Sequence, residues 1–554
     1  MTNDEIRRNT EIRMTNPAIA HQSALRHSSF GFLSLFVIRH SSFIAGLAAV
    51  TLACQAGAGE DLFAMHPVWR IEIELTPQNI DRLRTESRKY VPASVRAFGE
   101  VFRDVGVHLK GTGSYRPIDD KPSFTLDFAR FVAAQSLRGL QKLHLNNAVQ
   151  DGTYLKEQIA GELFRAAHVP VPRVAHALVT LNGRELGLYV IKEGFTQEFL
   201  SRHFERADGN LYDTDDGHDV DQHMKRHLGQ ESTHDQTDLQ RLAAAAMEAD
   251  LSRRWERLQQ TLDMDRFLAF MAMELIICHW DGYCLGRNNF LIYHDPRSGK
   301  INFLPSGMDQ VFSKADMPWN PDMAGLVARA IMEIPEGRRQ YAARFKELFA
   351  TVFVSENLTN RVNQLLADLR PRLQTAMFRE IRREADELCV QITERERHLI
   401  KQLSEPDPTF PDFDHDVALL AGWKAFDEPV GGKMHDGQGA ENKYVLRIVA
   451  GPKTSSSWRT AVRLKQGRYL FQGRARVTGV TPLPFGNSQG ASLRVAGKPQ
   501  RSAELTDTSA WEELKIEFEV RAPEEIVVLM CQLRGAAGEA SFDKASLSLV
   551  RRQQ

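Results

Sequence analysis

The stretch HWDGYCLGRNNFLIYHDPRSGKINFLPSGMD, from His279 to Asp309, decides how the rest of this chain is interpreted. Asp281 follows an apolar run that predicts a buried helix. Asn288 and Asn289 stand directly before a predicted strand, and a second predicted strand leads into Asp309. Side chains that carry oxygen are therefore expected at the points where a helix and two strands begin or end.

Two interpretations of these residues are open. In phosphoryl transfer, one Asp accepts or orients the proton of the attacking hydroxyl, while an Asn and a second Asp hold Mg²⁺ against the phosphates. Hard divalent ions take oxygen ligands, which these residues supply. Asp and Asn are also common in turns for conformational reasons alone. In isolation the segment favours turns, so the sequence upstream has to decide between the two.

The upstream region predicts a β-rich lobe. Val68–Leu75 alternates apolar and polar residues as a strand does, and Thr76 with a following Pro predicts a helix start. Val101–Asp127 contains two strand-like runs around a small-residue turn. Asn182-Gly183 joins two further runs and is a strong hairpin signal. Thr153–Ala167 has the spacing of an amphipathic helix.

A small-residue loop follows the first of these runs, in Val105-Gly-Val-His-Leu-Lys110-Gly-Thr-Gly-Ser114. Such a loop can bring backbone N–H groups near a phosphate, although it is not a Walker loop. Lys121 begins the next strand and is placed to neutralise a phosphate. Taken alone, it is more often a solvated lysine at a sheet edge.

The remaining chain divides in two. Gly209–Asp250 is polar and is expected to be a loop or insertion, Asp263 caps a helix, and Met323–Leu403 is helical almost throughout. A Pro-rich linker lies at 404–411. After it the sequence pattern changes to short strand-like runs separated by Gly-containing turns. These runs predict an all-β sandwich over 412–554. They are Tyr444–Val449, Trp458–Leu464, Tyr469–Val477, Ala491–Val495, Glu512–Val520, Ile526–Leu533 and Ala545–Val550.

The ordered series of segments resembles a known family. The segments are VGVHLKGTGSYRPIDDKPSFTLDF, LRGLQKLHLNNAVQDGTYLKEQIAGELFRAAHVPVPR, VTLNGRELGLYVIKEGFTQEFLSRHF, GNLYD and FLAFMAMELIICHWDGYCLGRNNFLIYHDPRSGKINFLPSGMDQVF. Each is unspecific, but their order and content are similar to the CotH kinase family of spore-coat-protein-H-like atypical kinases. The resemblance covers about Val68 to Leu403. It favours phosphoryl transfer over turn formation as the role of the residues from Asp281 to Asp309.

The resemblance implies a fold, a reaction and a set of site residues. The fold is α+β: a two-lobed atypical kinase-like domain over 60–403 with a helical extension, followed by a jelly-roll-like β-sandwich. The implied reaction transfers the γ-phosphate of ATP, with Mg²⁺ or Mn²⁺, to Ser residues of secreted or surface proteins. The implied roles fall to Asp281 as the catalytic residue, to Asp309, Asn289 and Asn288 at the metal, and to Lys121, Lys110, Glu157 and Glu193 at the nucleotide.

This chain departs from the family pattern at two places. The loop reads Lys110-Gly-Thr-Gly-Ser114 where the family has an Arg-Gly-Asn-Ser-like loop. Pro305-Ser-Gly-Met-Asp309 lacks the family's Trp-Asp, which leaves one carboxylate where two are common. The alternative is therefore a catalytically degenerate surface or adhesion protein. A third interpretation, a glycoside-processing enzyme, rests on the sandwich alone.

The first 59 residues are expected to be a leader. An apolar stretch, Phe43–Cys54, follows Arg39-His40 and precedes small residues, in the order of a secretory signal. Arg26-His-Ser-Ser-Phe30 recurs as Arg39-His-Ser-Ser-Phe43, which suggests a start downstream of Met1. Export follows as an expectation. Cys54 stands in a poor lipobox, so a lipoprotein is the less favoured form.

The composition of the chain limits the classes of binding partner that we expect. The 554 residues carry 70 basic and 71 acidic side chains, so no overall field favours nucleic acid. No stretch of the mature chain is long and apolar enough for a membrane span. The sandwich resembles carbohydrate-binding modules, so a polysaccharide is an expected partner. Its aromatic residues either stack on sugars or, more often, form the core, and they are Trp423, Trp458, Tyr469 and Trp511.

Three other patterns have plain explanations. Four histidines between His218 and His234 lie among aspartates but match neither an HExxH nor an EF-hand pattern, so they are expected in a solvated loop. Cys278 and Cys284 are close in sequence and are expected to be buried thiols. Arg379–Arg397 is a mixed-charge helix and is expected to face solvent.

Overall fold

The computed structural model describes residues 62–63, 68–214, 217–229, 236–406, 408–439, 442–483, 489–498 and 500–552. The predicted leader, 1–59, lies outside the described residues. Within the described part of the chain, no helix combines the length and the apolar character needed to cross a membrane.

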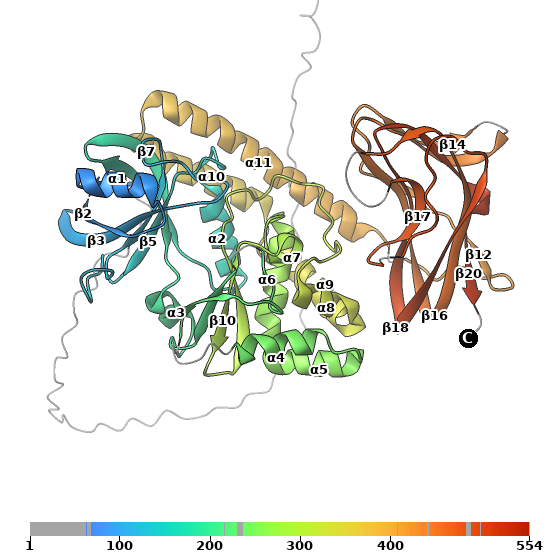
Figure 1. Cartoon of the computed structure of the whole chain (residues 1–554), viewed down its shortest axis with the longest axis horizontal. Helices are drawn as coiled ribbons and strands as arrows, with labels where there is room; N and C mark the ends of the chain where they lie inside the picture. The colour runs from blue at the N-terminus through green and yellow to red at the C-terminus, as the bar shows by residue number, and fades with distance from the viewer. Residues whose placement is uncertain are drawn as a thin grey trace, which may run out of the picture. The chain divides into compact units, whose positions relative to one another are not determined.

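The first lobe is a closed seven-stranded β-barrel, drawn in blue to teal in Figure 1. Its strand order is β1-β2-β3-β4-β5-β7-β6, and β1 closes it by pairing in parallel with β6. Side chains alternate along the strands, so one set fills the barrel with aliphatic and aromatic residues. The strands are β1 (Val68–Glu74), β2 (Val91–Ala97), β3 (Glu100–Lys110), β4 (Ser123–Asp127), β5 (Lys142–Asn146), β6 (Val174–Leu181) and β7 (Arg184–Glu193).

Local signals in this lobe are confirmed. Helix α1 (Pro77–Thr85) is capped by Thr76, whose hydroxyl accepts from the Asn79 N–H at 3.3 Å. Asn182 and Gly183 both adopt positive φ, as a two-residue hairpin between β6 and β7 requires. Helix α2 (Lys156–Ala166) lies between β5 and β6 in the chain and buries Glu157.

A second, four-stranded antiparallel sheet has the order β11-β10-β8-β9. Its strands are β8 (Asn210–Asp213), β9 (Lys225–Leu228), β10 (Phe290–Asp295) and β11 (Lys300–Pro305). The expectation of a loop over Gly209–Asp250 is wrong. This segment supplies β8, β9 and helix α4, and most of its sparse apolar residues, such as Leu211, Tyr212 and Leu242, are buried.

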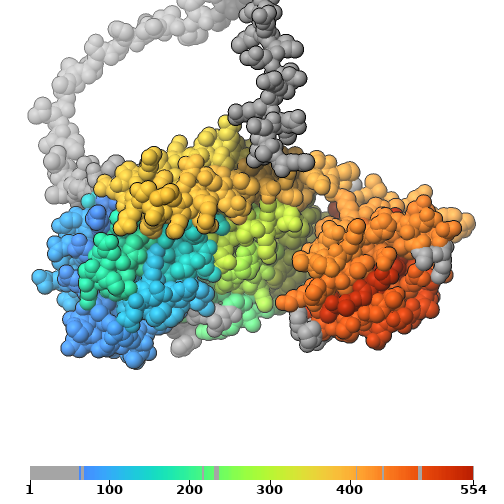
Figure 2. Space-filling view, turned by 90° about the horizontal axis from the view of Figure 1, so that it is seen from above, coloured from blue at the N-terminus to red at the C-terminus, as the bar shows by residue number. Residues whose placement is uncertain are grey.

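Helices surround this sheet and continue beyond it. They are α3 (Gln197–His203), α4 (Thr237–Ala246), α5 (Leu251–Thr261), α6 (Met264–Ile276), α7 (Tyr283–Gly286), α8 (Leu326–Glu333), α9 (Pro335–Thr351), α10 (Ser355–Leu369), the 3-10 turn η1 (Arg370–Arg372) and α11 (Thr375–Ser404). Asp263 caps α6 as predicted, accepting from the Arg266 N–H at 3.3 Å. In the space-filling view, the gold surface of α11 runs beside cyan segments of the first lobe (Figure 2).

The expectation that Arg379–Arg397 is a solvent face is wrong for the apolar side of the helix, which is buried, and for one charged residue. Arg395 on α11 is fully buried. Its guanidinium donates to the carbonyls of Leu275, Ile276, Ala315 and Met317 at 2.5–3.1 Å. These contacts join α11 to the end of α6 and to the segment that follows Asp309.

The terminal part is the predicted all-β sandwich, and its strands form two facing layers in Figure 1. The elements are β12 (Val417–Leu419), β13 (Lys424–Phe426), β14 (Lys433–Gln438), β15 (Tyr444–Val449), β16 (Thr454–Thr481), β17 (Gly490–Val495), β18 (Glu512–Gly535), β19 (Ala537–Asp543), η3 (Lys544–Ser546) and β20 (Ser548–Arg552). The predicted division of β16 and of β18 into two strands each is wrong. Both are continuous, with a register shift between Lys465 and Gly467.

Three of the four aromatic residues considered for sugar stacking belong to the sandwich core. Trp423, Trp458 and Tyr469 are at most 8 % exposed. Trp511 is half-buried, with the cationic ends of Lys443 and Arg476 over its ring, each 4.9 Å from the centroid. These side chains therefore stabilise the fold by burial, which is the more common role of such residues.

Candidate active site

The loop between α6 and β10 gathers the first three predicted site residues. The Asn288 amide donates to both carboxylate oxygens of Asp281 at 3.2 Å. The Asn289 amide donates to Asp281 Oδ2 at 2.8 Å and to its backbone carbonyl at 3.0 Å. Arg287 and Asn289 both have positive φ, which turns the chain back so that the two amides face Asp281.

The loop after β11, which carries Asp309, is joined to this first loop. The Ser306 N–H donates to the Asn289 carbonyl at 2.9 Å, and His279 Nε2 lies 3.1 Å from the Ser306 carbonyl. At Gly307, which has a φ of +56°, an added Cβ would lie 2.2 Å from Asn289 Oδ1. Only glycine allows this approach, and the Asn289 side-chain oxygen consequently lies against the loop that leads into Asp309.

A buried ion pair connects the barrel to the same place. Lys192, near the end of β7, pairs with Glu157 on α2, and both side chains are almost fully buried. The other oxygen of Glu157 accepts from the Met308 N–H at 3.2 Å, and Lys192 Nζ lies 3.4 Å from Ser306 Oγ. Glu157 therefore contacts both Lys192 and the residue before Asp309.

The charges at this junction shift one another's protonation. Burial, reinforced by the carboxylates of Glu157 and Asp151, raises the pKa of Asp309 to about 6, although Lys192 opposes the change. Burial also lowers the pKa of His279 to about 4, so this imidazole is neutral near pH 7. Perturbed groups that converge in this way are typical of functional sites.

Lys110, at the end of β3, lies within electrostatic reach of the same groups. Burial, together with the charge of Lys192, lowers its pKa to about 8, while Glu157 and Asp309 act in the opposite direction. Its amine donates to Asn146 Oδ1 at 2.7 Å. Lys110 therefore lies near enough to Glu157 and Asp309 for their charges to act on its pKa, and their shared role at a nucleotide and metal remains a prediction.

Lys121 and Glu193 have other neighbours. Lys121 donates to the Tyr154 hydroxyl at 2.7 Å and lies over the rings of Tyr154 and Tyr189, and burial lowers its pKa to about 8. Glu193 forms ion pairs with Arg173 and Arg202. These contacts account for the positions of both residues, and their roles at a nucleotide remain predictions.

The small-residue loop is held by a buried asparagine. Asn147, which is 1 % exposed, donates to the Ser114 carbonyl at 3.1 Å and to the Lys121 carbonyl at 2.9 Å. Gly111 has a φ of +102°, which a residue with a side chain rarely adopts. The loop thus has a defined shape between β3 and β4.

The donor set fits a hard divalent cation. Asp309 contributes a carboxylate whose pKa is raised chiefly by burial and further by nearby negative charge, which a cation would relieve. Asn289 uses its N–H₂ group on Asp281 and leaves its oxygen beside Gly307. Carboxylate and amide oxygens are the ligands that Mg²⁺ prefers.

Sequence analysis missed Lys192 and His279. Lys192 ends the apolar run Gly187-Leu-Tyr-Val-Ile-Lys192, and all residues from Leu188 to Glu193 are buried. A lysine inside a strand that is buried on both faces was the available signal, because such a lysine needs a partner. His279 adjoins Trp280 and Asp281 in the opening motif, but nothing in the spacing shows that its ring contacts the Ser306 carbonyl.

The other sequence patterns do not form a site. The described residues contain no group of three or more His, Cys, Asp or Glu side chains placed to hold a metal. His218 contacts the His223 carbonyl, His227 pairs with Asp213, and His234 lies outside the described residues. Cys278 and Cys284 are buried, free thiols, as expected.

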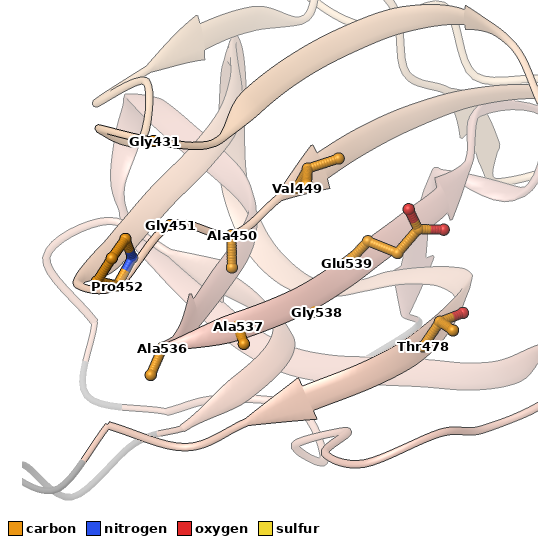
Figure 3. A pocket seen from close by; sticks show the side chains of 10 residues that line it. All are labelled: Gly431, Val449, Ala450, Gly451, Pro452, Thr478, Ala536, Ala537, Gly538 and Glu539. Carbon is orange, nitrogen blue, oxygen red and sulfur yellow. The ribbon is translucent and has the colours of Figure 1, made fainter.

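The sandwich carries a pocket of about 410 Å³ at one end, shown in Figure 3. Glycine, alanine and other small residues dominate its wall, and Thr478 and Glu539 add polar groups. Glu539 is already paired with Arg447. The pocket therefore lacks the set of nucleophiles, bases and ligands that catalysis needs.

A lysine–glutamate pair, an Asp–Asn–Asn cluster and a strand-end Asp are the groups that a kinase-like protein uses. The family model described as CotH kinase protein matches residues 107–399. The chain belongs to the CotH kinase family.

Two curated relatives match part of the chain. Invasin CotH2 of Rhizopus delemar is 23% identical over 262 residues, which cover 42% of this chain and 44% of that protein. Inner spore coat protein H of Bacillus subtilis is 21% identical over 300 residues, covering 50% of this chain and 82% of that protein. The chain thus spans less than half the length of the fungal relative.

Solved structures resemble parts of the fold weakly. The Helicobacter pylori proinflammatory kinase CtkA has a TM-score of 0.26 at 8% identity, covering 61% of this chain and 100% of that one. TmCBM61, solved with β-1,4-galactotriose, has a TM-score of 0.18 at 16% identity, covering 24% of this chain and 91% of that one.

Proposed function

We propose that this chain is an exported, ATP-dependent protein kinase that phosphorylates Ser residues of secreted or surface proteins. Family membership supports the kinase class. The names of its relatives, an inner spore coat protein and an invasin, support a location outside the cytoplasm. The acceptor protein, the nucleotide and the export step belong to the proposal.

The positions of the side chains support the following proposed reaction. The acceptor Ser Oγ attacks the γ-phosphorus of ATP, a new O–P bond forms, the bond to the β-phosphate oxygen breaks, and ADP leaves. Asp281 accepts the hydroxyl proton, since its carboxylate is held in place by Asn288 and Asn289. Lys192 and Lys110 bind phosphate oxygens, and Glu157 keeps Lys192 in place.

Asp309 and Asn289, with Asn288 beside them, would hold Mg²⁺ or Mn²⁺. When bound, the ion supplies positive charge that neutralises the phosphates. Asp309 supplies a carboxylate that is ionised above pH 6, and Glu157 fixes the backbone just before it. Lys121 and Glu193 remain predicted contacts at the nucleotide.

One observation carries the proposal. Glu157 contacts Lys192 through one oxygen and the Met308 N–H through the other. A single side chain thereby couples the proposed phosphate-binding lysine to the proposed metal-binding loop. A turn-forming role for Asp281 and Asp309 gives no reason for a buried lysine and glutamate to lie beside them.

The test is phosphate transfer by the chain from residue 60 onward. With γ-labelled ATP, Mg²⁺ or Mn²⁺ and dephosphorylated casein as a generic Ser acceptor, we expect labelled phosphoserine. Asp309→Ala and Lys192→Met should each abolish labelling while the protein stays folded. Asp316→Ala is the matched control, because Asp316 is an exposed acid further along the same segment.

The alternative, a degenerate surface protein, predicts a different result. Neither labelling nor a rise in melting temperature with ATP and Mg²⁺ would then be seen, although ligands that bind the native state normally raise it. A polysaccharide partner for the sandwich also remains a prediction. Binding of the full chain to a glycan array tests it separately.

A further inference from the structure

We propose that Glu274 on α6 is a positioning residue that sets the orientation of Asp281 through the backbone of residues 282–284. The proposal rests on the proposed function, because it assigns a role within that reaction. Glu274 does not contact Asp281 itself. It stands in the segment from Phe267 that carries the family resemblance, but the sequence analysis assigned it no role.

Both oxygens of this buried carboxylate are used on the loop. Glu274 is 0 % exposed. Its Oε1 accepts from the Tyr283 N–H at 2.9 Å, and its Oε2 accepts from the Cys284 N–H at 2.8 Å. No ion pair of Glu274 with a cationic side chain occurs in the described part of the chain. The two backbone amides therefore meet the demand of a buried acid that is costly to leave unpaired.

The turn next to Asp281 is built directly over this carboxylate. A Cβ added at Gly282 would lie 2.4 Å from Glu274 Oε1 and 2.8 Å from His279 Cδ2. The approach is closer than any side chain permits, so the path of the chain after Asp281 depends on the place of the Glu274 carboxyl group.

The same turn reaches the residues that orient Asp281. The Gly282 carbonyl accepts from the Gly286 N–H at 2.8 Å and from the Asn288 N–H at 3.4 Å. Asn288 in turn donates its side-chain amide to the Asp281 carboxylate. A shift of residues 282–284 would move Asp281 and its hydrogen-bond donor together.

Asp219 provides an internal comparison. It is also a buried acid, and it accepts from the Tyr283 hydroxyl at 3.1 Å and from the Leu326 N–H at 2.7 Å. It therefore holds the outer end of the Tyr283 side chain and the start of α8, but not the backbone beside Asp281. Loss of the Asp219 carboxylate should weaken packing around Tyr283 without changing the backbone conformation of residues 282–284.

The decisive variant is Glu274→Gln, which keeps the shape but replaces one acceptor by an N–H₂ group facing an N–H. With casein as acceptor, we expect kcat to fall about 10- to 100-fold, as misplacement of a reacting group does. The KM for ATP should stay within about 2-fold, since the nucleotide is bound by other residues. Glu274→Asp, which keeps the charge but is shorter, should recover part of kcat.

Two further measurements separate positioning from stability. Asp219→Asn should lower the melting temperature to a similar extent and leave kcat within about 3-fold. Hydrogen exchange of peptides covering 281–289 should speed up in Glu274→Gln and not in Asp219→Asn. The proposal is overturned if both variants lose kcat in proportion to stability, or if Glu274→Gln has the kcat and exchange of the wild type. If the wild type transfers no phosphate, the proposed function fails, and the exchange experiment still decides whether Glu274 holds this loop.

Discussion

The kinase-like part and the terminal sandwich bury different kinds of side chain. Residues 68–404 bury ionisable groups in several places, whereas Asp543 is the single fully buried acid or base among the described residues of 412–552. The polar groups buried in the sandwich are otherwise Ser, Thr and Gln. The buried ionisable groups of the first part are Asp151, Glu157, His176, Lys192, Glu193, Asp219, Arg254, Glu274, His279, Asp295 and Arg395.

The difference in buried ionisable groups separates the sandwich from the part of the chain that contains the candidate site. Burial of an ionised group is expensive unless it is paired or hydrogen-bonded, and an apolar core is usually at least as stable. The sandwich core is apolar and buries almost no ionisable side chains. In the kinase-like part, Glu157, Glu274 and His279 contact the loops that carry Asp281 and Asp309. Arg395 contacts the end of α6 and the chain beyond Asp309. Several of the buried ionisable groups thus lie in the region of the candidate site.

The largest effect is expected when the buried pair is broken. Glu157→Ala leaves Lys192 buried without its partner, which should lower the free energy of unfolding by about 3–5 kcal/mol. Phosphate transfer should fall at least about 100-fold, because the Met308 contact and the lysine position are lost together. Urea unfolding and the labelling assay measure the two effects.

The ion pair between Arg361 and Glu162 is the control, because it joins α10 to α2 but is partly exposed. Glu162→Ala should cost about 1 kcal/mol or less and keep activity. Equal losses of stability and activity in Glu157→Ala and Glu162→Ala would show that any ion pair of α2 has the same effect, which would contradict a special role for Glu157.

A core substitution in the sandwich should change stability alone. Trp458→Ala removes a 6 % exposed side chain, for which about 3–5 kcal/mol is typical. Tyr444→Ala, at 64 % exposure, should stay within about 0.5 kcal/mol. Calorimetry gives the stabilities, and both variants should keep the kcat of the wild type. A loss of kcat in Trp458→Ala would contradict the expectation that the sandwich core contributes to stability and not to phosphate transfer.

Replacement of Arg395 by methionine should cost about 2–3 kcal/mol, because buried carbonyls lose their donor. Arg395→Lys should recover little, since an ammonium cannot reach four carbonyls in a planar arrangement. Chemical denaturation followed by tryptophan fluorescence measures both. The exposed Arg383→Met on the same helix serves as control, and a similar loss there would contradict the special place of Arg395.

The pH dependence of stability should reveal Glu274. Burial raises its pKa from 4.5 to about 7. An acid with a higher pKa in the folded state binds its proton more tightly there, so it adds stability below pH 4.5 that disappears as the pH rises through 7. The total is at most about 3 kcal/mol. Glu274→Gln should lack this decline between pH 5 and 8 in urea unfolding, and parallel curves for the two proteins would refute the assignment.

Local patterns predicted most of the fold because they depend on neighbours in the sequence. The Thr76 cap, the Asn182-Gly183 hairpin and the Asp263 cap each act within a few residues and are confirmed. The segment Gly209–Asp250 was misjudged because its few apolar residues are buried by partners distant in the chain. The strands β16 and β18 continue through Gly and Pro signals because each supplies the other's hydrogen bonds.

The candidate site could be predicted in part for the same reason. Asp281, Asn288 and Asn289 lie within one loop, and their contacts follow from their spacing. Lys192, Glu274 and Arg395 act across 35 to 120 residues of chain or through backbone groups. Single-sequence patterns do not register such contacts, and Arg395 in particular was hidden among exposed charges of α11.

Arg395 also bears on the order in which the molecule can be completed. The Leu275 carbonyl that it binds is made 120 residues earlier during synthesis. During synthesis, the contacts of Arg395 with the end of α6 can form only after most of α11 has been made. A chain cut short before this arginine would keep the whole stretch from His279 to Asp309 and still lack these contacts.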